Sequence, residues 1–162
     1  MARWAILCVF LLVLSQAWTL GEKPVPSELK DPFLFCDACY ATITEVTAMM
    51  VQSKGSKLKQ RIKTALDSVC STDHLRRYIL SPPKMTKACS ALLKTWRFEL
   101  EQLLQEQFHG GKESNVDILL ETFCRGESSI QACREDQEFP TRKRDRERSE
   151  QQSKAQEPKD EL

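Results

Sequence analysis

Two cysteines three residues apart, Cys36 and Cys39, form the one motif in this sequence that is typical of a reactive site. A CxxC pair can carry out thiol–disulfide exchange when one sulfur has a lowered pKa and some exposure to solvent. Thioredoxin-like enzymes place the motif between a strand and a helix, and no βαβ pattern surrounds it here. We therefore favour a structural role for both sulfurs and keep thiol–disulfide exchange through them as an alternative.

No other pattern in the sequence predicts catalytic residues, a metal or a cofactor. The two histidines, His74 and His109, lack ligand spacing to a cysteine pair. Glu99 and Glu101 are two residues apart and do not share a helix face, so they do not form an acid–base pair. Neither a nucleophile motif nor a glycine-rich phosphate loop occurs. The 24 basic and 23 acidic residues nearly cancel, which argues against a nucleic-acid partner.

The N-terminus has the pattern of a secretory signal peptide. A basic start ending at Arg3 is followed by an apolar run from Trp4 to Leu14, and small residues come next. The run is too short to cross a bilayer, which needs about 20 apolar residues. We expect a signal peptide over residues 1–17, with residue 21 as a second cleavage position.

The C-terminus carries a second targeting signal. A free C-terminal KDEL tetrapeptide is read by the receptor that returns proteins to the endoplasmic reticulum (ER). Here the tetrapeptide consists of Lys159, Asp160, Glu161 and Leu162. Together, the two ends predict a resident of the ER lumen whose first partner is the KDEL receptor.

Six of the seven cysteines remain after the signal peptide is removed. They are Cys36, Cys39, Cys70, Cys89, Cys124 and Cys133. An even number of cysteines in an oxidising compartment predicts a disulfide framework, although the count alone does not fix the pairing.

The apolar residues between Pro32 and Cys133 recur with a helical period, and no stretch alternates long enough to form a strand. The sequence therefore predicts an all-α domain. The expected helices cover about residues 36–54, 58–70, 82–109 and 116–124.

The positions of the cysteines on these helices suggest a nested pairing. If the four helices fold as two hairpins, the start of the first lies near the end of the fourth, and the second ends near the start of the third. That arrangement predicts the bonds Cys36–Cys133, Cys39–Cys124 and Cys70–Cys89. In the loop-entropy treatment the outer bond restricts the unfolded chain by roughly 4–5 kcal/mol.

The remaining segments complete the expected organisation. Residues 18–31 contain two prolines and mixed charge and read as a linker, and residues 32–134 form the domain. Residues 135–162 have one aromatic side chain, Phe139, and a dense charge run over 142–148. Such a segment buries too little apolar surface to offset its ordering entropy, so we expect a disordered charged tail.

Two surfaces could meet a partner. One is an apolar patch made of Leu75, Tyr78, Ile79 and Leu80. Burial of these side chains at the end of the core is the favoured interpretation of this patch. The other is the basic face of residues 57–63, which could meet anionic lipid. Membrane lipid is not favoured as a partner, because 13 basic and 11 acidic residues between Pro32 and Cys133 give little attraction to a membrane.

The order of the cysteines on amphipathic helices resembles the saposin-like fold over residues 36–133, with four to five helices and three nested disulfides. With a signal peptide and a KDEL-type end, the chain is similar to the canopy family, whose opening CxxC the run Cys36-Asp37-Ala38-Cys39 matches. The resemblance implies an accessory chaperone without catalytic residues, acting with the ER Hsp90-type chaperone on secretory or receptor clients. A plasma-cell-expressed member implies weak thiol oxidoreductase activity as the first alternative, and the saposin-like fold implies lipid binding as the second.

Overall fold

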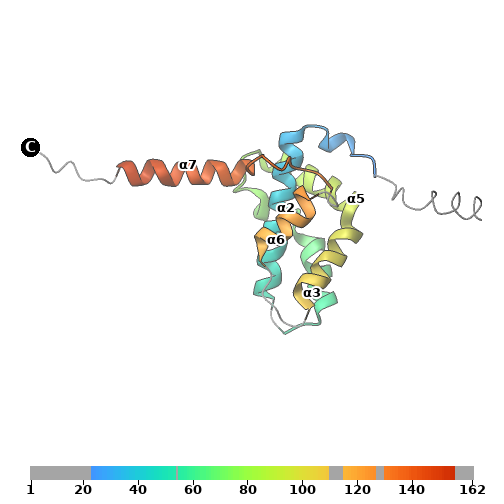
Figure 1. Cartoon of the computed structure of the whole chain (residues 1–162). Coiled ribbons are helices and arrows are strands. Elements are labelled where there is room, and N and C mark those ends of the chain that lie inside the picture. Colours follow the sequence, from blue (N-terminus) through green and yellow to red (C-terminus); the bar gives the residue numbers. More distant parts are fainter. Residues whose placement is uncertain (1–22, 54, 110–114, 127–129, 156–162) are drawn as a thin grey trace, which may run out of the picture.

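A computed structural model describes residues 23–53, 55–109, 115–126 and 130–155 (Figure 1). These residues contain helices and no strand, which confirms the all-α prediction. The α-helices are α2 (Pro32–Gln52), α3 (Leu58–Ser68), α4 (Thr72–Leu75), α5 (Pro82–Phe108), α6 (Val116–Leu120) and α7 (Pro140–Ala155). A 3-10 helix, η1 (Ser27–Leu29), precedes them, and a π-helical turn, η3 (Glu121–Arg125), follows α6.

Helix α2 forms the centre of the bundle. It starts where Asp31 accepts hydrogen bonds from the backbone N–H groups of Phe33 and Leu34, with Pro32 in the first turn. Its length and composition would allow it to cross a membrane, but 72% of its most apolar window is buried inside the protein. This burial is what we expect of the core helix of a bundle, against which α3, α5 and α6 pack.

Helix α5 is the longest element and carries much of the remaining core. Ser81 stands at its N-cap, but its side chain makes no capping hydrogen bond among the described residues, and two prolines occupy the first turn. The helix bends at Trp96, whose backbone leaves helical geometry and whose ring stacks on Phe35 with the centroids 5.5 Å apart. The stacked pair joins α5 to the first turn of α2.

Helix α6 begins at Val116, where the apolar pattern predicted the start of the fourth helix. Asn115 caps it, and the side-chain oxygen of Asn115 accepts the N–H of Asp117 at 2.9 Å. The short α6 continues into η3, and this turn ends at Arg125 directly after Cys124.

The predicted linker packs on the bundle over its described part, residues 23–31. Leu29 of η1 is buried in the core, and Lys23 pairs with Glu99 on α5. The predicted linker is therefore attached to the bundle over these residues. Leu29 explains the attachment, because one buried apolar side chain anchors the short turn that carries it.

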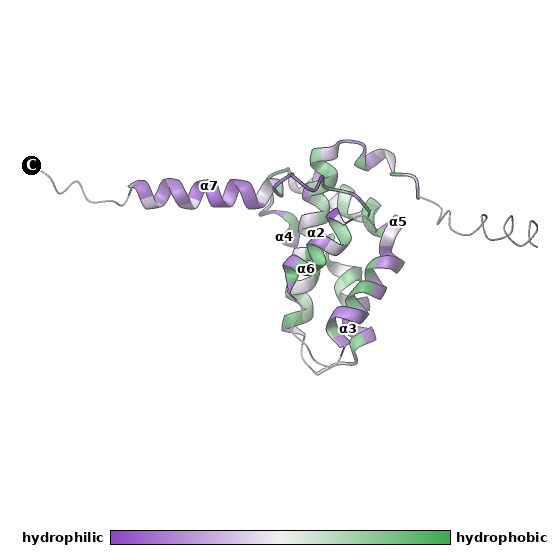
Figure 2. Cartoon of the chain, in the orientation of Figure 1, coloured by the Kyte–Doolittle hydropathy of each residue, from purple (hydrophilic) through white to green (hydrophobic). Residues whose placement is uncertain are grey.

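The prediction of a disordered tail is also wrong over Pro140–Ala155, which form α7. Phe139 and Thr141 are buried, so the folded body extends past the expected boundary at residue 134. Proline is well tolerated in a first helical turn, and ion pairs four residues apart, such as Arg146–Glu150, support the turns that follow. Helix α7 projects from the bundle (Figure 1) and is hydrophilic along its length (Figure 2).

Candidate functional site

All six cysteines of the described residues are in disulfides, and the bonds are the three predicted ones. Cys36 bonds Cys133 with their Cα atoms 4.6 Å apart, and Cys39 bonds Cys124 at 6.0 Å. The third bond, Cys70–Cys89, joins the end of α3 to α5 at a Cα separation of 5.5 Å. The nested arrangement inferred from two hairpins is thus confirmed.

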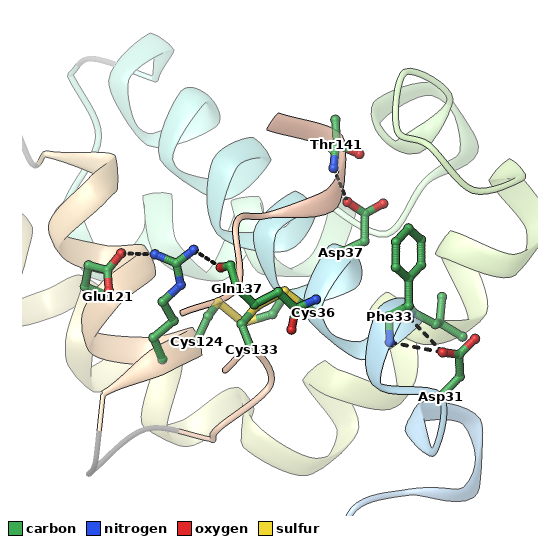
Figure 3. Close-up of a disulfide and its surroundings, with 12 residues drawn as sticks. Asp31, Phe33, Cys36, Asp37, Glu121, Cys124, Cys133, Gln137 and Thr141 are labelled. Atoms are coloured by element: carbon green, nitrogen blue, oxygen red, sulfur yellow. Dashed lines mark hydrogen bonds and ion pairs between the residues drawn. A yellow bond between two sulfur atoms is a disulfide. The ribbon is translucent and has the colours of Figure 1, made fainter. Parts of the chain in front are cut away.

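The CxxC motif lies in the first two turns of α2, at the end of the bundle shown in Figure 3. Its two sulfurs are bonded to η3 and to the segment after it, and not to each other. Both Cys36 and Cys39 are 0% exposed. Thiol–disulfide exchange needs an accessible sulfur, and in this arrangement the motif presents none to solvent.

Asp37 lies between these two cysteines and is the most unusual residue of the site. It is fully buried, and one carboxylate oxygen accepts the backbone N–H of Thr141 at 3.0 Å (Figure 3). Its second oxygen, Oδ2, has no hydrogen-bond partner among the described residues. Burial raises the pKa of Asp37, while hydrogen bonds from Thr141 act in the opposite direction.

Thr141 connects three elements at this point. Its N–H donates to Asp37 on α2, and its hydroxyl oxygen accepts the backbone N–H of Ile79 at 3.0 Å. One turn later, Arg144 donates to the carbonyl oxygen of Arg77 at 2.9 Å. The first turn of α7 is therefore fixed both to the core helix and to the segment that follows α4.

The chain that leads into α7, residues 130–141, is called the docked segment below. It is held first by backbone hydrogen bonds from Ile130 to Phe123 and from Cys133 to Cys124. Further along, the ring of Phe139 is buried and stacks on Tyr40 with the centroids 4.9 Å apart. The docked segment thus covers the side of α2 next to the CxxC motif.

Two arginines flank the ring of Phe139. Arg125 lies over it at 3.9 Å, donates to Glu121 at 2.6 Å and donates also to the carbonyl oxygen of Gln137 (Figure 3). Arg142 lies 5.8 Å from the same ring and donates to Asp117 at 2.5 Å. These cation–π contacts and ion pairs orient the docked segment against α6 and η3.

A second buried carboxylate, Glu45, lies two turns further along α2. It accepts the hydroxyl of Tyr78 at 2.7 Å and pairs with Arg77 at 2.7 Å. The Nδ1 atom of His74 is 3.8 Å from the same carboxylate. Burial and the neighbouring Glu45 raise the pKa of Tyr78, so the phenol stays protonated and continues to donate.

Much of the predicted partner patch is buried at this cluster. Leu75 and Tyr78 are buried, so they do not form an exposed surface, and Leu80 is half-buried. Ile79 is 39% exposed and remains available. The apolar patch is therefore mainly an end of the core, as the favoured interpretation had it.

The described residues contain no cluster of metal-ligating side chains. The predicted signal peptide over 1–17 and the predicted retrieval signal of Lys159, Asp160, Glu161 and Leu162 lie outside the described residues.

Sequence reasoning missed Asp37, Phe139 and Thr141 as anchors. Phe139-Pro140-Thr141 carries a recognisable signal, because proline is favoured in a first helical turn and a lone aromatic residue in a charged stretch tends to be buried. No comparable signal marks Asp37. Its burial depends on a contact between residues 104 positions apart.

Comparison of the chain with protein-family models, with curated proteins and with solved structures gave no match.

Proposed function

We propose that this protein is an accessory folding factor of the ER lumen with a saposin-like domain, a relative of the canopy proteins. In this proposal a signal peptide brings the chain into the secretory pathway, and the C-terminal tetrapeptide returns it through the KDEL receptor. There it binds selected secretory or receptor polypeptides together with the ER Hsp90-type chaperone. Binding, and not turnover, is its activity.

The observation that carries the proposal is the use of all six described cysteines in bonds between elements. A rigid, disulfide-linked bundle of this size suits a compartment that is oxidising and rich in folding proteins. Because Cys36 and Cys39 have partners other than each other, binding is a better account of the CxxC motif than thiol exchange.

Helix α7 supports the same proposal. A helix of 16 residues extends about 24 Å, and α7 ends at Ala155, seven residues before the C-terminus. It projects from the bundle (Figure 1), so its C-terminal end lies well away from the body. A retrieval receptor bound beyond this end of α7 would not displace a polypeptide bound to the bundle.

Crosslinking in secretory cells tests the proposal. The natural chain should capture nascent secretory or receptor polypeptides, identified by mass spectrometry after reversal of the crosslink. A variant that lacks Leu162 should be found in the medium, and it serves as the control for capture inside the compartment. Recovery of the KDEL receptor alone, with no secretory polypeptide, would contradict the proposed activity.

A further inference from the structure

The net positive charge of the described chain resides in α7. Residues 23–139 contain, among those described, fourteen basic and fourteen acidic side chains. Residues 140–155 contain six basic and three acidic ones. Within α7 the excess lies in residues 142–148, with five basic and two acidic side chains, while residues 149–155 are balanced. The excess is therefore at the base of the helix, where it leaves the bundle.

Two more arginines adjoin this base. Arg76 and Arg77 follow α4 and are exposed, and the carbonyl oxygen of Arg77 accepts a hydrogen bond from Arg144. Arg144 and Arg148 lie four residues apart and hence on one face of α7. Arg148 therefore lies one turn beyond the contact with the segment after α4. We call the set Arg76, Arg77, Lys143, Arg144 and Arg148 the basic junction.

Part of this charge is already compensated. Arg77 pairs with Glu45, and Arg144 pairs with Asp145. Among the described residues, Arg76, Lys143 and Arg148 are exposed and form no ion pair. Within the basic junction, the charge without an ion pair among the described residues thus belongs to these three side chains.

We propose that the basic junction is a docking surface for an acidic segment of a partner polypeptide. The inference rests on the proposed function, because it names the chemistry by which the protein holds part of a client or co-chaperone. Carboxylates of such a segment would pair with Arg76, Lys143 and Arg148. An apolar side chain of the same segment would contact Ile79, which is 39% exposed beside Thr141.

The surface fits a polypeptide better than a membrane. A helix that lies in a lipid interface needs an apolar face to insert, and α7 is hydrophilic all along its length (Figure 2). One exposed isoleucine and three cations without ion pairs, on α7 and on the segment after α4, match a chain that alternates carboxylates with occasional apolar residues. Planar guanidinium groups, such as those of Arg76 and Arg148, bind carboxylates with two parallel hydrogen bonds.

The test uses the mature full-length protein and a fluorescein-labelled peptide of glutamate and leucine, with a glutamine–leucine peptide of equal length as probe control. Binding is measured by fluorescence anisotropy at near-physiological salt. The variant R76E/K143E/R148E reverses the three free charges. The matched variant K59E/K87E/K94E reverses three exposed lysines on α3 and α5 that form no ion pair among the described residues. Melting curves establish that both variants are folded.

We expect the junction variant to bind the glutamate peptide at least about tenfold more weakly, since several modest surface pairs are lost together. The matched variant should change affinity by less than about twofold, and the glutamine peptide should not bind. Affinity should fall as salt rises, because exposed charges are screened.

Three results would overturn the assignment. An equal loss in both variants would mean general electrostatic attraction without a defined surface. Equal binding of the glutamine peptide would show that binding does not depend on carboxylates. Tight binding of a heparin fragment that depends on the junction, without binding of the glutamate peptide, would assign the surface to a sulfated glycan. If crosslinking to secretory polypeptides persists in the junction variant, the proposed function stands and only the docking surface fails.

Discussion

Asp37 on α2 connects this helix to α7, and burial of its carboxylate costs free energy. Its carboxylate accepts the N–H of Thr141 in the first turn of α7, where a negative charge is favourable next to the helix N-terminus. The group is nevertheless fully buried, and one of its oxygens has no partner in the described part of the chain. Desolvation dominates, so the pKa of Asp37 is raised. The connection to α7 is therefore made by a group that would be more stable uncharged.

This conflict predicts the pH dependence of stability. A carboxyl group with a raised pKa in the folded state destabilises the fold at neutral pH, and the penalty disappears as pH falls through the folded pKa toward the unfolded value. We expect D37N, which can still accept the N–H of Thr141, to be more stable than the natural protein at pH 7. The difference in the free energy of unfolding should shrink as pH approaches 4, measured by urea unfolding at several pH values.

The control for this prediction is D37A, which removes the acceptor. It should be less stable by about 1–3 kcal/mol, because the N–H of Thr141 is left buried without a partner. A gap between D37N and the natural protein that widens with acid would contradict the assigned direction of the pKa shift.

Tyr78 gives a second prediction at this scale. Its hydroxyl donates to the buried carboxylate of Glu45, and hydrogen bonds to charged acceptors contribute about 1.5–3 kcal/mol. Y78F should lower the free energy of unfolding by about that amount. A double-mutant cycle with E45A, which removes the acceptor, isolates the pair, and a coupling energy near zero would show that the bond contributes nothing.

At the residue scale the sequence was informative about sulfur and uninformative about buried charge. Cys36, Cys39 and their partners could be paired from their positions on predicted helices alone. Asp37 and Glu45 could not be identified as buried, because carboxylates are usually exposed. The contacts that compensate them form only in the fold, from Thr141 to Asp37 and from Tyr78 and Arg77 to Glu45.

At the scale of elements, the apolar period located α2, α3, α5 and α6 well. It missed α4, which has four residues and is too short to show a period. It also missed α7, because a helix that buries only its first turn has no apolar stripe to detect. Both missed helices are held by contacts distant in sequence, and such contacts leave no local pattern.

The docked segment provides a prediction for α7. Phe139 is the main apolar anchor of residues 130–141, and replacing a buried phenylalanine by alanine costs about 3–5 kcal/mol. We expect F139A to detach the first turn of α7, so that backbone amides over 137–144 exchange with solvent about a hundredfold faster or more. Hydrogen–deuterium exchange with mass spectrometry measures the change.

Phe98 supplies the matched control for this change. It lies on α5 and is 65% exposed, so F98A makes the same chemical substitution without removing a buried contact. Exchange over 137–144 should be unchanged in F98A. If F139A leaves this exchange rate as it is, the two flanking arginines and the Asp37–Thr141 bond hold α7 without the aromatic anchor.

At the scale of the whole molecule, the outer two disulfides join the same two ends of the chain. Cys36–Cys133 spans 97 residues and Cys39–Cys124 spans 85. When one of the two bonds is already present, forming the other closes only a short loop. That loop consists of three residues on α2 and the nine residues from Cys124 to Cys133. Each bond therefore substitutes for most of the loop closure that the other provides.

This redundancy predicts a non-additive loss of stability. In the loop-entropy treatment, removing either outer bond alone costs about 3 kcal/mol, whereas removing both costs about 7 kcal/mol. Since domains of this kind have a total stability of about 5–15 kcal/mol, the double removal should unfold the chain or nearly so.

We expect C36A/C133A and C39A/C124A each to retain a helical, cooperatively melting domain, and the variant lacking all four cysteines to lose it. Circular dichroism and thermal melting measure the outcome, with C70A/C89A as a single-bond control. If removing either outer bond alone already costs the roughly 4–5 kcal/mol expected for closing the whole long loop, the two bonds do not substitute for each other and the redundancy fails.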